Sequence, residues 1–293
     1  MKTIIKKCLN FLAASIASQI KPHSDREFRS GFPVYFPTGP NKTPTIFIHN
    51  RYGQRVFLDP ADYFISSHFL EILEWEEHLE EVYKDSFLDG GIYLDIGANV
   101  GLHVLRAHRL GATKTYAFEP VPNTFDILSI NINANGLSSN PSNCAIGVNC
   151  ALGEKEGVLG MNLDDYTPSM ARIEEGDNAS LEVPVKTLNN FSDEHPEIVT
   201  EKLSLVKIDV EGHEGEVING AIDFLKKHSD FNIIVEFGSP SSVQGVQLLD
   251  QNFTFSMKLY RWMQEPIEVD MDFVNNEEKR LGGDLVLFGL KPK

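Results

Sequence analysis

The sequence contains little cysteine. Its 293 residues include three, Cys8, Cys144 and Cys150, an odd number without the spacing of a metal site. This argues against a disulfide framework and a zinc site, and it favours a reducing, cytoplasmic setting. Because Cys144 and Cys150 lie in an apolar stretch, we interpret their thiols as small buried hydrophobes.

Basic residues are also scarce. The chain has 26 Lys and Arg against 42 Asp and Glu, which gives a net charge of −16. Proteins that bind nucleic acid need an excess of positive charge to neutralise phosphates. The composition therefore predicts no nucleic-acid partner, and it argues against acidic polymers as substrates.

The N-terminal segment lacks a hydrophobic run long enough to cross a membrane. Its apolar stretch, Cys8 to Ile20, has 13 residues and polar interruptions, whereas a spanning helix needs about 20. Four lysines and no acid occur in the first 24 residues. Residues 1–21 therefore predict a basic amphipathic helix, which could lie on an anionic membrane surface or dock on the domain or a second subunit. A signal peptide is a third reading, and the oligomeric state stays open.

What the sequence does contain is typical of a globular chain. Hydrophobic residues make up 42% and charged residues 23%. Four prolines between residues 31 and 44 mark an irregular connector. We therefore expect an N-terminal helix and connector over residues 1–44, followed by one large domain over residues 45–293.

The first part of this domain predicts a hairpin and a helix over residues 45–88. Thr45–His49 and Arg55–Leu58 are strand-like and flank the turn sequence Asn50–Gly53. Residues 68–87 have a helical pattern with many acids, which we interpret as a solvated helix face. These acids are Glu71, Glu74, Glu76, Glu77, Glu80 and Glu81.

Short apolar strands then alternate with amphipathic helices. The predicted strands are residues 92–96, 115–119, 144–152, 203–209 and 231–237. This alternation predicts an α/β fold with a doubly wound, mostly parallel sheet covered by helices on both faces. Residues 153–202 interrupt the alternation, and we predict that they form an inserted β-rich flap.

The ends of the first two strands predict a nucleoside site. Ligands of an open parallel sheet bind at the carboxyl ends of its strands. The first strand ends in Asp95-Ile-Gly97-Ala-Asn99-Val-Gly101, and Asn99 takes the place of the second glycine of a nicotinamide fingerprint. Glu119, 24 residues after Asp95, can accept hydrogen bonds from both ribose hydroxyls. A nucleoside without pyrophosphate, such as S-adenosylmethionine, fits this pattern; the alternative is a tight turn with a solvated Glu119.

A second set of charged residues ends the fourth strand. Lys207 and Asp209 lie within an apolar strand, so they should be paired with each other or face a ligand. Glu211 follows just beyond the strand, and Glu236 ends the fifth strand. The alternative is a structural pair of Lys207 and Asp209, with the remaining acids capping the next helix.

Together these motifs resemble the FkbM family of S-adenosylmethionine-dependent methyltransferases. The resemblance runs from about residue 51 to 236 and implies a class I, Rossmann-like methyltransferase fold with a β-rich insertion and an N-terminal extension. It also implies S-adenosylmethionine as cofactor and O-methylation of a sugar, a glycan or another small molecule. The motifs are Trp75-Glu76, Asp95–Gly101, Ala117–Pro120, Val206–Glu214, Gly220-Ala221 and Ile234–Glu236.

The resemblance assigns roles to these positions. One of Asp209, Glu211 or His213 takes the acceptor proton, with Glu211 favoured, and Lys207 belongs to the same catalytic group. His213 departs from the smaller residue that is often found there. The residues assigned to the cofactor are Asp95, Gly97, Ala98, Asn99, Gly101, Glu119, Pro120 and Ala151, and those assigned to the acceptor are Glu236 and Tyr166.

Other functions remain open at this point. Asp209 and Glu236, together with Glu211, could hold a divalent cation that polarises the acceptor hydroxyl. The chain could also be a catalytically silent nucleoside-binding module that partners a glycan-synthesis enzyme. The aromatic residues Tyr166, Tyr260 and Trp262 could stack on a sugar ring or simply pack in the core.

Overall fold

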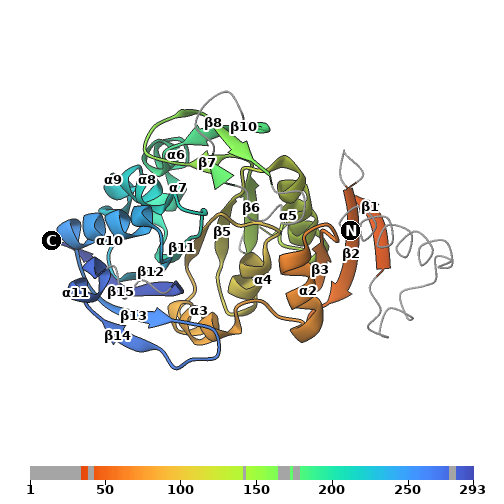
Figure 1. Cartoon of the computed structure of the whole chain (residues 1–293), viewed down its shortest axis with the longest axis horizontal. Helices are drawn as coiled ribbons and strands as arrows, with labels where there is room; N and C mark the ends of the chain where they lie inside the picture. Colours follow the sequence, from red (N-terminus) through yellow and green to blue (C-terminus); the bar gives the residue numbers. More distant parts are fainter. Residues whose placement is uncertain (1–33, 39–42, 141–142, 164–171, 174–178, 277–281) are drawn as a thin grey trace.

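A computed structural model describes residues 34–38, 43–140, 143–163, 172–173, 179–276 and 282–293 (Figure 1). Tyr166 and the predicted helix over residues 1–21 lie outside these ranges. Membrane contact of residues 1–21 therefore stays a prediction. Within the ranges, no helix has both the length and the apolar character that a membrane span requires.

The core of the molecule is an eight-stranded sheet. Its strands, in order across the sheet, are β14 (Ile267–Val269), β13 (Phe253–Tyr260), β15 (Asp284–Pro292), β12 (Phe231–Glu236), β11 (Leu203–Ile208), β4 (Ile92–Ile96), β5 (Lys114–Phe118) and β6 (Cys144–Val148). The five strands from β12 to β6 are parallel, whereas β15, β13 and β14 pair antiparallel. The predicted mostly parallel α/β fold is thus confirmed.

The direction of the chain reverses in the middle of this sheet. From β4 it passes through α4 (Leu102–Arg109), β5 and α5 (Pro122–Ala134) to β6, and it later returns to β11 on the other side of β4. The carboxyl ends of β4 and β11 therefore flank a topological switch point, where open α/β sheets bind their ligands.

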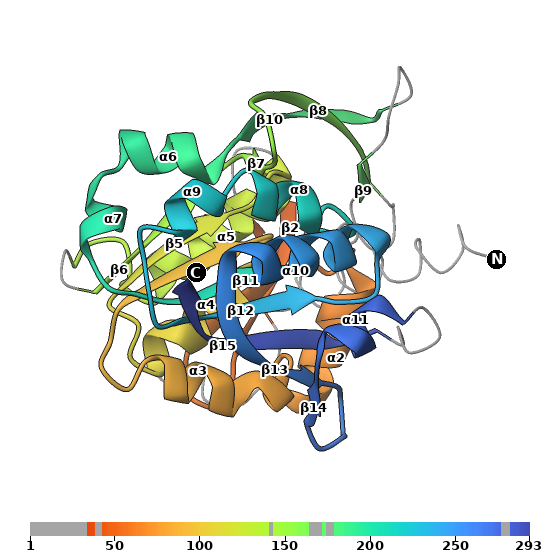
Figure 2. The ribbon, with the colours of Figure 1, turned by 90° about the vertical axis from the view of Figure 1, so that its left-hand side faces the viewer.

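Helices cover both faces because side chains alternate along each strand. Ile92, Leu94 and Ile96 of β4 join the core beneath α6 (Leu188–Glu194), α8 (Glu214–Asn219), α9 (Ile222–Leu225) and α10 (Pro240–Asn252). Tyr93, between them in sequence, packs with α3 (Glu80–Ser86) on the opposite face. Figure 2 shows α6, α8, α9 and α10 on one side of the sheet and α3 on the other. The short helices α7 (Glu197–Thr200) and α11 (Met271–Asn275) complete the layer of α6, α8, α9 and α10.

The predicted hairpin is present, but the predicted helix over residues 68–87 is interrupted. Strands β2 (Thr43–His49) and β3 (Arg55–Leu58) pair antiparallel, and β1 (Val34–Thr38) adds a third strand. Helix α2 (Tyr63–Ile72) is capped by Leu73, and the chain then passes through the 3₁₀ turn η2 (Glu77–Leu79) into α3. Leu73 and Glu76 have left-handed backbone φ of 56° and 46°, which a continuous helix cannot contain.

The β-rich insertion forms a sheet of its own. Strands β7 (Ala151–Leu152), β10 (Leu181–Lys186), β8 (Gly157–Asn162) and β9 (Arg172–Ile173) pair in that order. The prediction of one strand over 144–152 was wrong, because β6 ends at Val148 and β7 joins the smaller sheet. The Asn149 side chain fixes the turn between them by donating to the carbonyls of Glu119 and Pro120, at 2.8 and 3.0 Å.

Candidate active site

A cavity of about 660 Å³ opens at the carboxyl ends of the parallel strands. Most of the predicted site residues line it, namely Gly97, Ala98, Asn99, Glu119, Pro120, Ala151, Lys207, Asp209, Glu211, His213 and Glu236. Asp95 and Gly101 are not among the lining residues, and Tyr166 lies outside the described ranges. The structure thus brings the motifs together in one cavity, while their individual roles stay predictions.

The glycines of the loop after β4 are required by contacts within the protein. Gly97 has a φ of +84°, and a Cβ there would lie 1.8 Å from the carbonyl oxygen of Asp209. A Cβ on Gly101 would lie 2.6 Å from Leu128 of α5. Gly97 therefore lets the ends of β4 and β11 approach each other, and Gly101 lets the loop pack on α5.

Glu119 lies at the end of β5 and is held by the backbone. Its two carboxylate oxygens accept hydrogen bonds from the amides of Val121 at 2.8 Å and Asn99 at 3.0 Å. Burial raises the pKa of Glu119 to about 7, although both amides oppose this shift. Each oxygen retains a further lone pair, so this carboxylate can accept the two hydroxyls of a ribose.

Apolar side chains surround the part of the cavity next to Glu119. Cys150 precedes β7, Ala151 begins it, and Leu159 and Met161 come from β8 of the insertion. Such a wall suits a flat, uncharged base. We call this part the nucleoside end, defined by Ala98, Asn99, Glu119, Ala151 and Met161.

Lys207 is a buried cation paired with Asp209. Its ammonium lies 2.5 Å from Asp209 Oδ2, and its side chain is only 2% exposed. Burial would lower the pKa of Lys207, but the carboxylates of Asp209 and Glu76 outweigh it and hold the pKa well above its usual value. The pair that the sequence left open is therefore formed, and it also lines the cavity.

Three carboxylates meet at the ends of β11 and β12. Asp209, Glu211 and Glu236 each place an oxygen within 4.8 Å of the others, and we call this group the carboxylate rim. Burial raises the pKa of Glu236 to about 9, and the charges of Asp209 and Glu211 add to the shift. Within the described ranges this group has the geometry to hold a divalent cation, as the metal alternative expects.

The residues after the rim divide between cavity and helix cap. His213 precedes α8, lines the cavity and lies with its Nδ1 3.5 Å from Glu216 Oε2. Glu214 instead accepts hydrogen bonds from the Gly212 amide at 2.9 Å and the Ser239 hydroxyl at 2.8 Å. Part of the acidic run is thus structural, as the capping alternative expected.

The other part of the cavity is aromatic, and sequence reasoning largely missed it. The ring of His68 in α2 lies 5.2 Å from that of Trp75 and 4.5 Å from that of Trp262, between ring centroids. Trp262 follows β13, so two distant segments build this wall. We call it the aromatic end, defined by His68, Trp75, Glu76, His78, His103, Trp262 and Asp284, all of which line the cavity.

Two pairs of polar side chains belong to the aromatic end. His78 Nε2 lies 2.8 Å from Asp284 Oδ2, and His103 Nε2 lies 2.9 Å from Glu76 Oε2. Burial and the charge of Lys207 lower the pKa of His103 to about 4, so this imidazole is neutral at pH 7. Burial and the charge of Glu76 raise the pKa of Asp284 to about 6.

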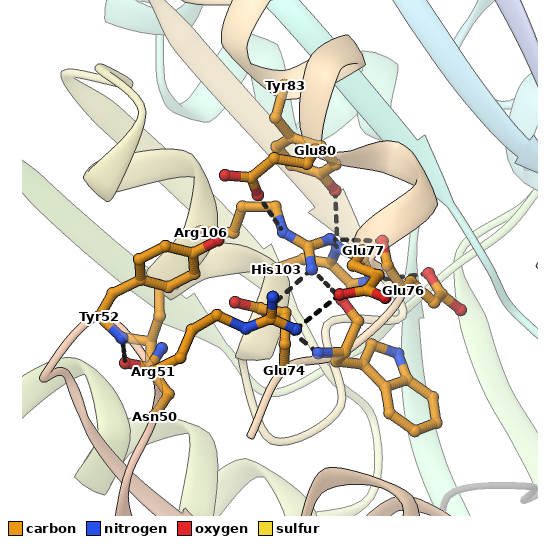
Figure 3. A network of polar contacts seen from close by, with 12 residues as sticks. Asn50, Arg51, Tyr52, Glu74, Glu76, Glu77, Glu80, Tyr83, His103 and Arg106 are labelled. Atoms are coloured by element: carbon orange, nitrogen blue, oxygen red, sulfur yellow. Dashed lines mark hydrogen bonds and ion pairs between the residues drawn. The ribbon is translucent and has the colours of Figure 1, made fainter. Parts of the chain in front are cut away.

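Arg106 of α4 holds the helix break that carries this wall (Figure 3). Its side chain is 1% exposed, and its guanidinium donates to Glu74 Oε1 at 2.9 Å, to the Trp75 carbonyl and to the Glu76 carbonyl at 3.2 Å. The interpretation of these acids as a solvated face was therefore wrong for Glu74, which is 4% exposed. The available signal was Arg106 itself, a charged residue among the apolar positions of a helix.

Asp95 lies on the sheet face behind this network. Tyr83 Oη contacts Tyr93 Oη at 2.8 Å and His103 Nδ1 at 2.9 Å, and Asp95 follows Tyr93 on the same face. Asp95 is 1% exposed, and its carboxylate interacts with the Tyr93 hydroxyl. Burial raises its pKa to about 7 against the opposing charge of Lys207. Its role as a direct cofactor ligand stays a prediction.

Comparison with known proteins places these features among methyltransferases. A family model described as the methyltransferase FkbM domain matches residues 95–265. Methyltransferase 1 of Beauveria bassiana is 26% identical over 191 residues, which cover 57% of this chain and 73% of that protein. Hexuronic acid methyltransferase AglP of Haloferax volcanii is 31% identical over 156 residues, which cover 50% of this chain and 55% of that protein.

A solved structure, methyltransferase FkbM from Methylobacillus flagellatus KT, is 13% identical with a TM-score of 0.44. The match covers 75% of this chain and 52% of the chain in that structure. The chain thus spans about half the length of this structure and of the Haloferax protein.

Proposed function

The chain belongs to the FkbM family of S-adenosylmethionine-dependent methyltransferases, and we propose that it methylates a hydroxyl of a sugar, a glycan or another small molecule. The observation that carries this proposal is one continuous cavity. It runs from the carboxylate of Glu119, past the carboxylate rim, to the aromatic end. A nucleoside cofactor and a ring-shaped acceptor can thus meet at the rim.

The side chains around the nucleoside end fit S-adenosylmethionine. Glu119 has free acceptor capacity toward the cavity, which suits ribose hydroxyls, and Ala151 and Met161 offer apolar contact to adenine. When bound, the cofactor supplies an electrophilic methyl group on a sulfonium.

The protein contributes position and a proton acceptor. Orienting an acceptor oxygen at about 3–3.5 Å from its target supplies most of the acceleration in such displacements. An attacking hydroxyl must also lose its proton, and a base can contribute about 10²–10⁴-fold. We propose that Asp209, Glu211 or His213 takes this proton. Glu211 is favoured because it lies just beyond β11, whereas Asp209 is already paired with Lys207.

The aromatic end supports a ring-bearing acceptor. Trp75 and Trp262 offer flat faces, and the carboxylates of Glu76 and Asp284 beside them can accept hydrogen bonds from hydroxyl groups. The name of the Haloferax relative, a hexuronic acid methyltransferase, supports a sugar. Glu236, which pairs with Asp284 across strands β12 and β15, keeps its proposed contact with the acceptor.

A screen for methyl transfer tests the proposal. The purified chain is incubated with S-adenosylmethionine and a panel of methyl glycosides, including hexuronides, and the products are analysed by mass spectrometry. We expect a mass gain of one methyl group, absent without cofactor, with fragmentation that locates it on oxygen. A methyl group on nitrogen or carbon would contradict the O-methylation. Cofactor binding without transfer to any acceptor or extract would favour the silent module.

A divalent-cation-dependent reaction is the second candidate, favoured by the 4.8 Å cluster of the rim. We propose instead a metal-free reaction, because the Lys207 ammonium at 2.5 Å already neutralises Asp209. Activity should then survive an excess of chelator. Loss of activity that Mg²⁺ or Mn²⁺ restores would instead assign the rim to a metal.

A further inference from the structure

Arg261 brings a positive charge to the wall that carries the aromatic end. It follows β13 directly, and both Arg261 and Trp262 line the cavity. The chain turns at this point, where Met263 has a left-handed φ of 54°, so that two consecutive side chains reach the same space. Lysine and arginine supply one other lining residue, Lys207, whose ammonium lies 2.5 Å from Asp209 Oδ2. The charge of Lys207 is therefore already matched within the protein.

Two glycines before β15 hold the Arg261 side chain. Its Nε donates a hydrogen bond to the Gly282 carbonyl at 2.9 Å. Gly283 has a φ of +130°, and a Cβ there would lie 2.9 Å from Arg261 Cγ and 2.6 Å from the Tyr260 carbonyl oxygen. Gly283 thus leaves the room that the aliphatic part of Arg261 occupies, and Gly282 restricts the orientation of the guanidinium.

The terminal nitrogens of this guanidinium are available to a ligand. Arg51, Arg106 and Arg109 each form an ion pair with a glutamate. For Arg261, the part of the chain that the structure describes supplies no such ion pair. The bond to Gly282 uses one of its five N–H donors. The two Nη groups form a flat fork, which binds a carboxylate through two parallel hydrogen bonds.

We propose that Arg261 selects an acceptor that carries a carboxylate, namely a sugar acid. Its guanidinium binds the carboxylate while the sugar ring lies against Trp262 and a hydroxyl faces the carboxylate rim. This inference rests on the proposed function and narrows its acceptor to an anion. A phosphate fits less well, because it carries about 1.5–2 negative charges at pH 7 and the carboxylates of Glu76 and Asp284 line the same end.

Paired acceptors test this inference. The full chain is assayed with S-adenosylmethionine and with methyl hexuronides, their primary amides, neutral methyl hexosides and hexose phosphates. The amide keeps the ring and the hydroxyls of the acid but removes its charge. We expect kcat/KM of the acid to exceed that of its amide about 10–100-fold, because hydrogen bonds between charged groups are stronger than those to a neutral group.

The possible outcomes separate the inference from the proposed function. Equal kcat/KM for acid and amide, or transfer to neutral hexosides alone, would overturn the inference and leave the proposed function intact. A preference for hexose phosphates would overturn the assignment to a carboxylate. Absence of methyl transfer to every acceptor and extract would contradict the proposed function itself.

Substitution of Arg261 locates the effect. Arg261→Gln should lower kcat/KM for the acid to that of its amide, mainly by raising KM, and leave turnover of the amide and the affinity for S-adenosylmethionine unchanged. Arg261→Lys should retain part of the preference, because lysine keeps the charge without the fork. Activity toward the amide reports that each variant is folded.

The matched control is Arg55→Gln. Arg55 is exposed, donates to a backbone carbonyl, that of Ala134 at 3.3 Å, and does not line the cavity. We expect this variant to keep the full preference for the acid. An undiminished preference in Arg261→Gln, or an equal loss in Arg55→Gln, would overturn the assignment to Arg261.

Discussion

The two ends of the cavity are built in different ways. At the nucleoside end, Glu119 and the loop at Asn99 follow neighbouring strands, and backbone amides hold the carboxylate. At the aromatic end, Trp75 and Trp262 come from distant parts of the chain. There, contacts of the Arg106 side chain hold the wall.

This difference determines which end a sequence reveals. A site held by backbone amides requires a short motif with fixed spacing, and such a motif is visible in one sequence. A site held by a buried side-chain network requires partners that meet only after folding. The sequence therefore indicated residues of the nucleoside end that the structure brings into one cavity, and their contacts with the cofactor stay a prediction, whereas the aromatic end was largely missed.

The largest expected effect is at the rim, where the two ends meet. The three variants to compare are Asp209→Asn, Glu211→Gln and His213→Asn. The variant that lacks the base should show a rate of methyl transfer reduced by about 10²–10⁴-fold, because the acceptor keeps its proton. The rate is measured with saturating cofactor and the acceptor found by the screen. Undiminished turnover in all three variants would exclude the whole group.

Arg106→Met should damage the aromatic end alone. It leaves Glu74 buried without its cation, and loss of one partner of a buried pair costs about 3–5 kcal/mol of the free energy of unfolding. The control is Arg51→Met, because Arg51 pairs with Glu77 at 38% and 49% exposure, and exposed pairs contribute about 0–1 kcal/mol. Urea unfolding compares the two. Equal losses would show that the buried network does not stabilise this wall.

Glu119→Ala should damage the nucleoside end alone. Hydrogen bonds to a charged group contribute about 1.5–3 kcal/mol, so the affinity for S-adenosylmethionine should fall about 10–100-fold. Calorimetry measures this affinity, and Glu81→Ala serves as the exposed control. Unchanged affinity would refute the assignment of Glu119 to the ribose.

The smallest effects should have opposite dependence on pH for one glutamate of each end, Glu119 and Glu76. The pKa of Glu119 is raised to about 7, so its contribution to stability is present at low pH and is lost as the pH rises toward 7. For Glu76, burial would raise the pKa, but the charge of Lys207 and the contact with His103 lower it instead. Its contribution is therefore present at neutral pH and is lost as the pH falls below about 4.

Urea unfolding of Glu119→Gln and Glu76→Gln between pH 3.5 and 8 measures this difference. Relative to the unmodified chain, Glu119→Gln should gain about 1–3 kcal/mol between pH 4.5 and 8. Glu76→Gln should instead be less stable at pH 7 and approach the unmodified chain at the acidic limit. The same pH dependence in both variants would contradict the opposite pKa shifts of the two glutamates.

The sequence predicted the parallel strands of the sheet, but neither the antiparallel strands β13, β14 and β15 nor the breaks between elements. β4, β11 and β12 are buried apolar runs, so their local composition is sufficient. The turn at Asn149 depends on carbonyls of residues 119 and 120, and the break at 73–76 depends on Arg106. Periodicity within a short window does not contain these partners.

The same limit applies to individual side chains of the site. A run of glutamates on a helical pattern has the composition of a solvated face, and Glu81 is indeed exposed. Glu74 is buried only because Arg106, 32 residues later, reaches it. Gly97 also depends on a distant residue, because a Cβ there would lie 1.8 Å from the carbonyl oxygen of Asp209.

The chain contains two tryptophans, and both line the cavity at its aromatic end. Ultraviolet emission excited at the indole band therefore originates beside the proposed acceptor position. An acceptor that displaces solvent from Trp75 and Trp262 should change the wavelength or intensity of this emission. The protein thus carries an intrinsic optical reporter for its unknown acceptor, which allows compound libraries to be searched by fluorescence without a label.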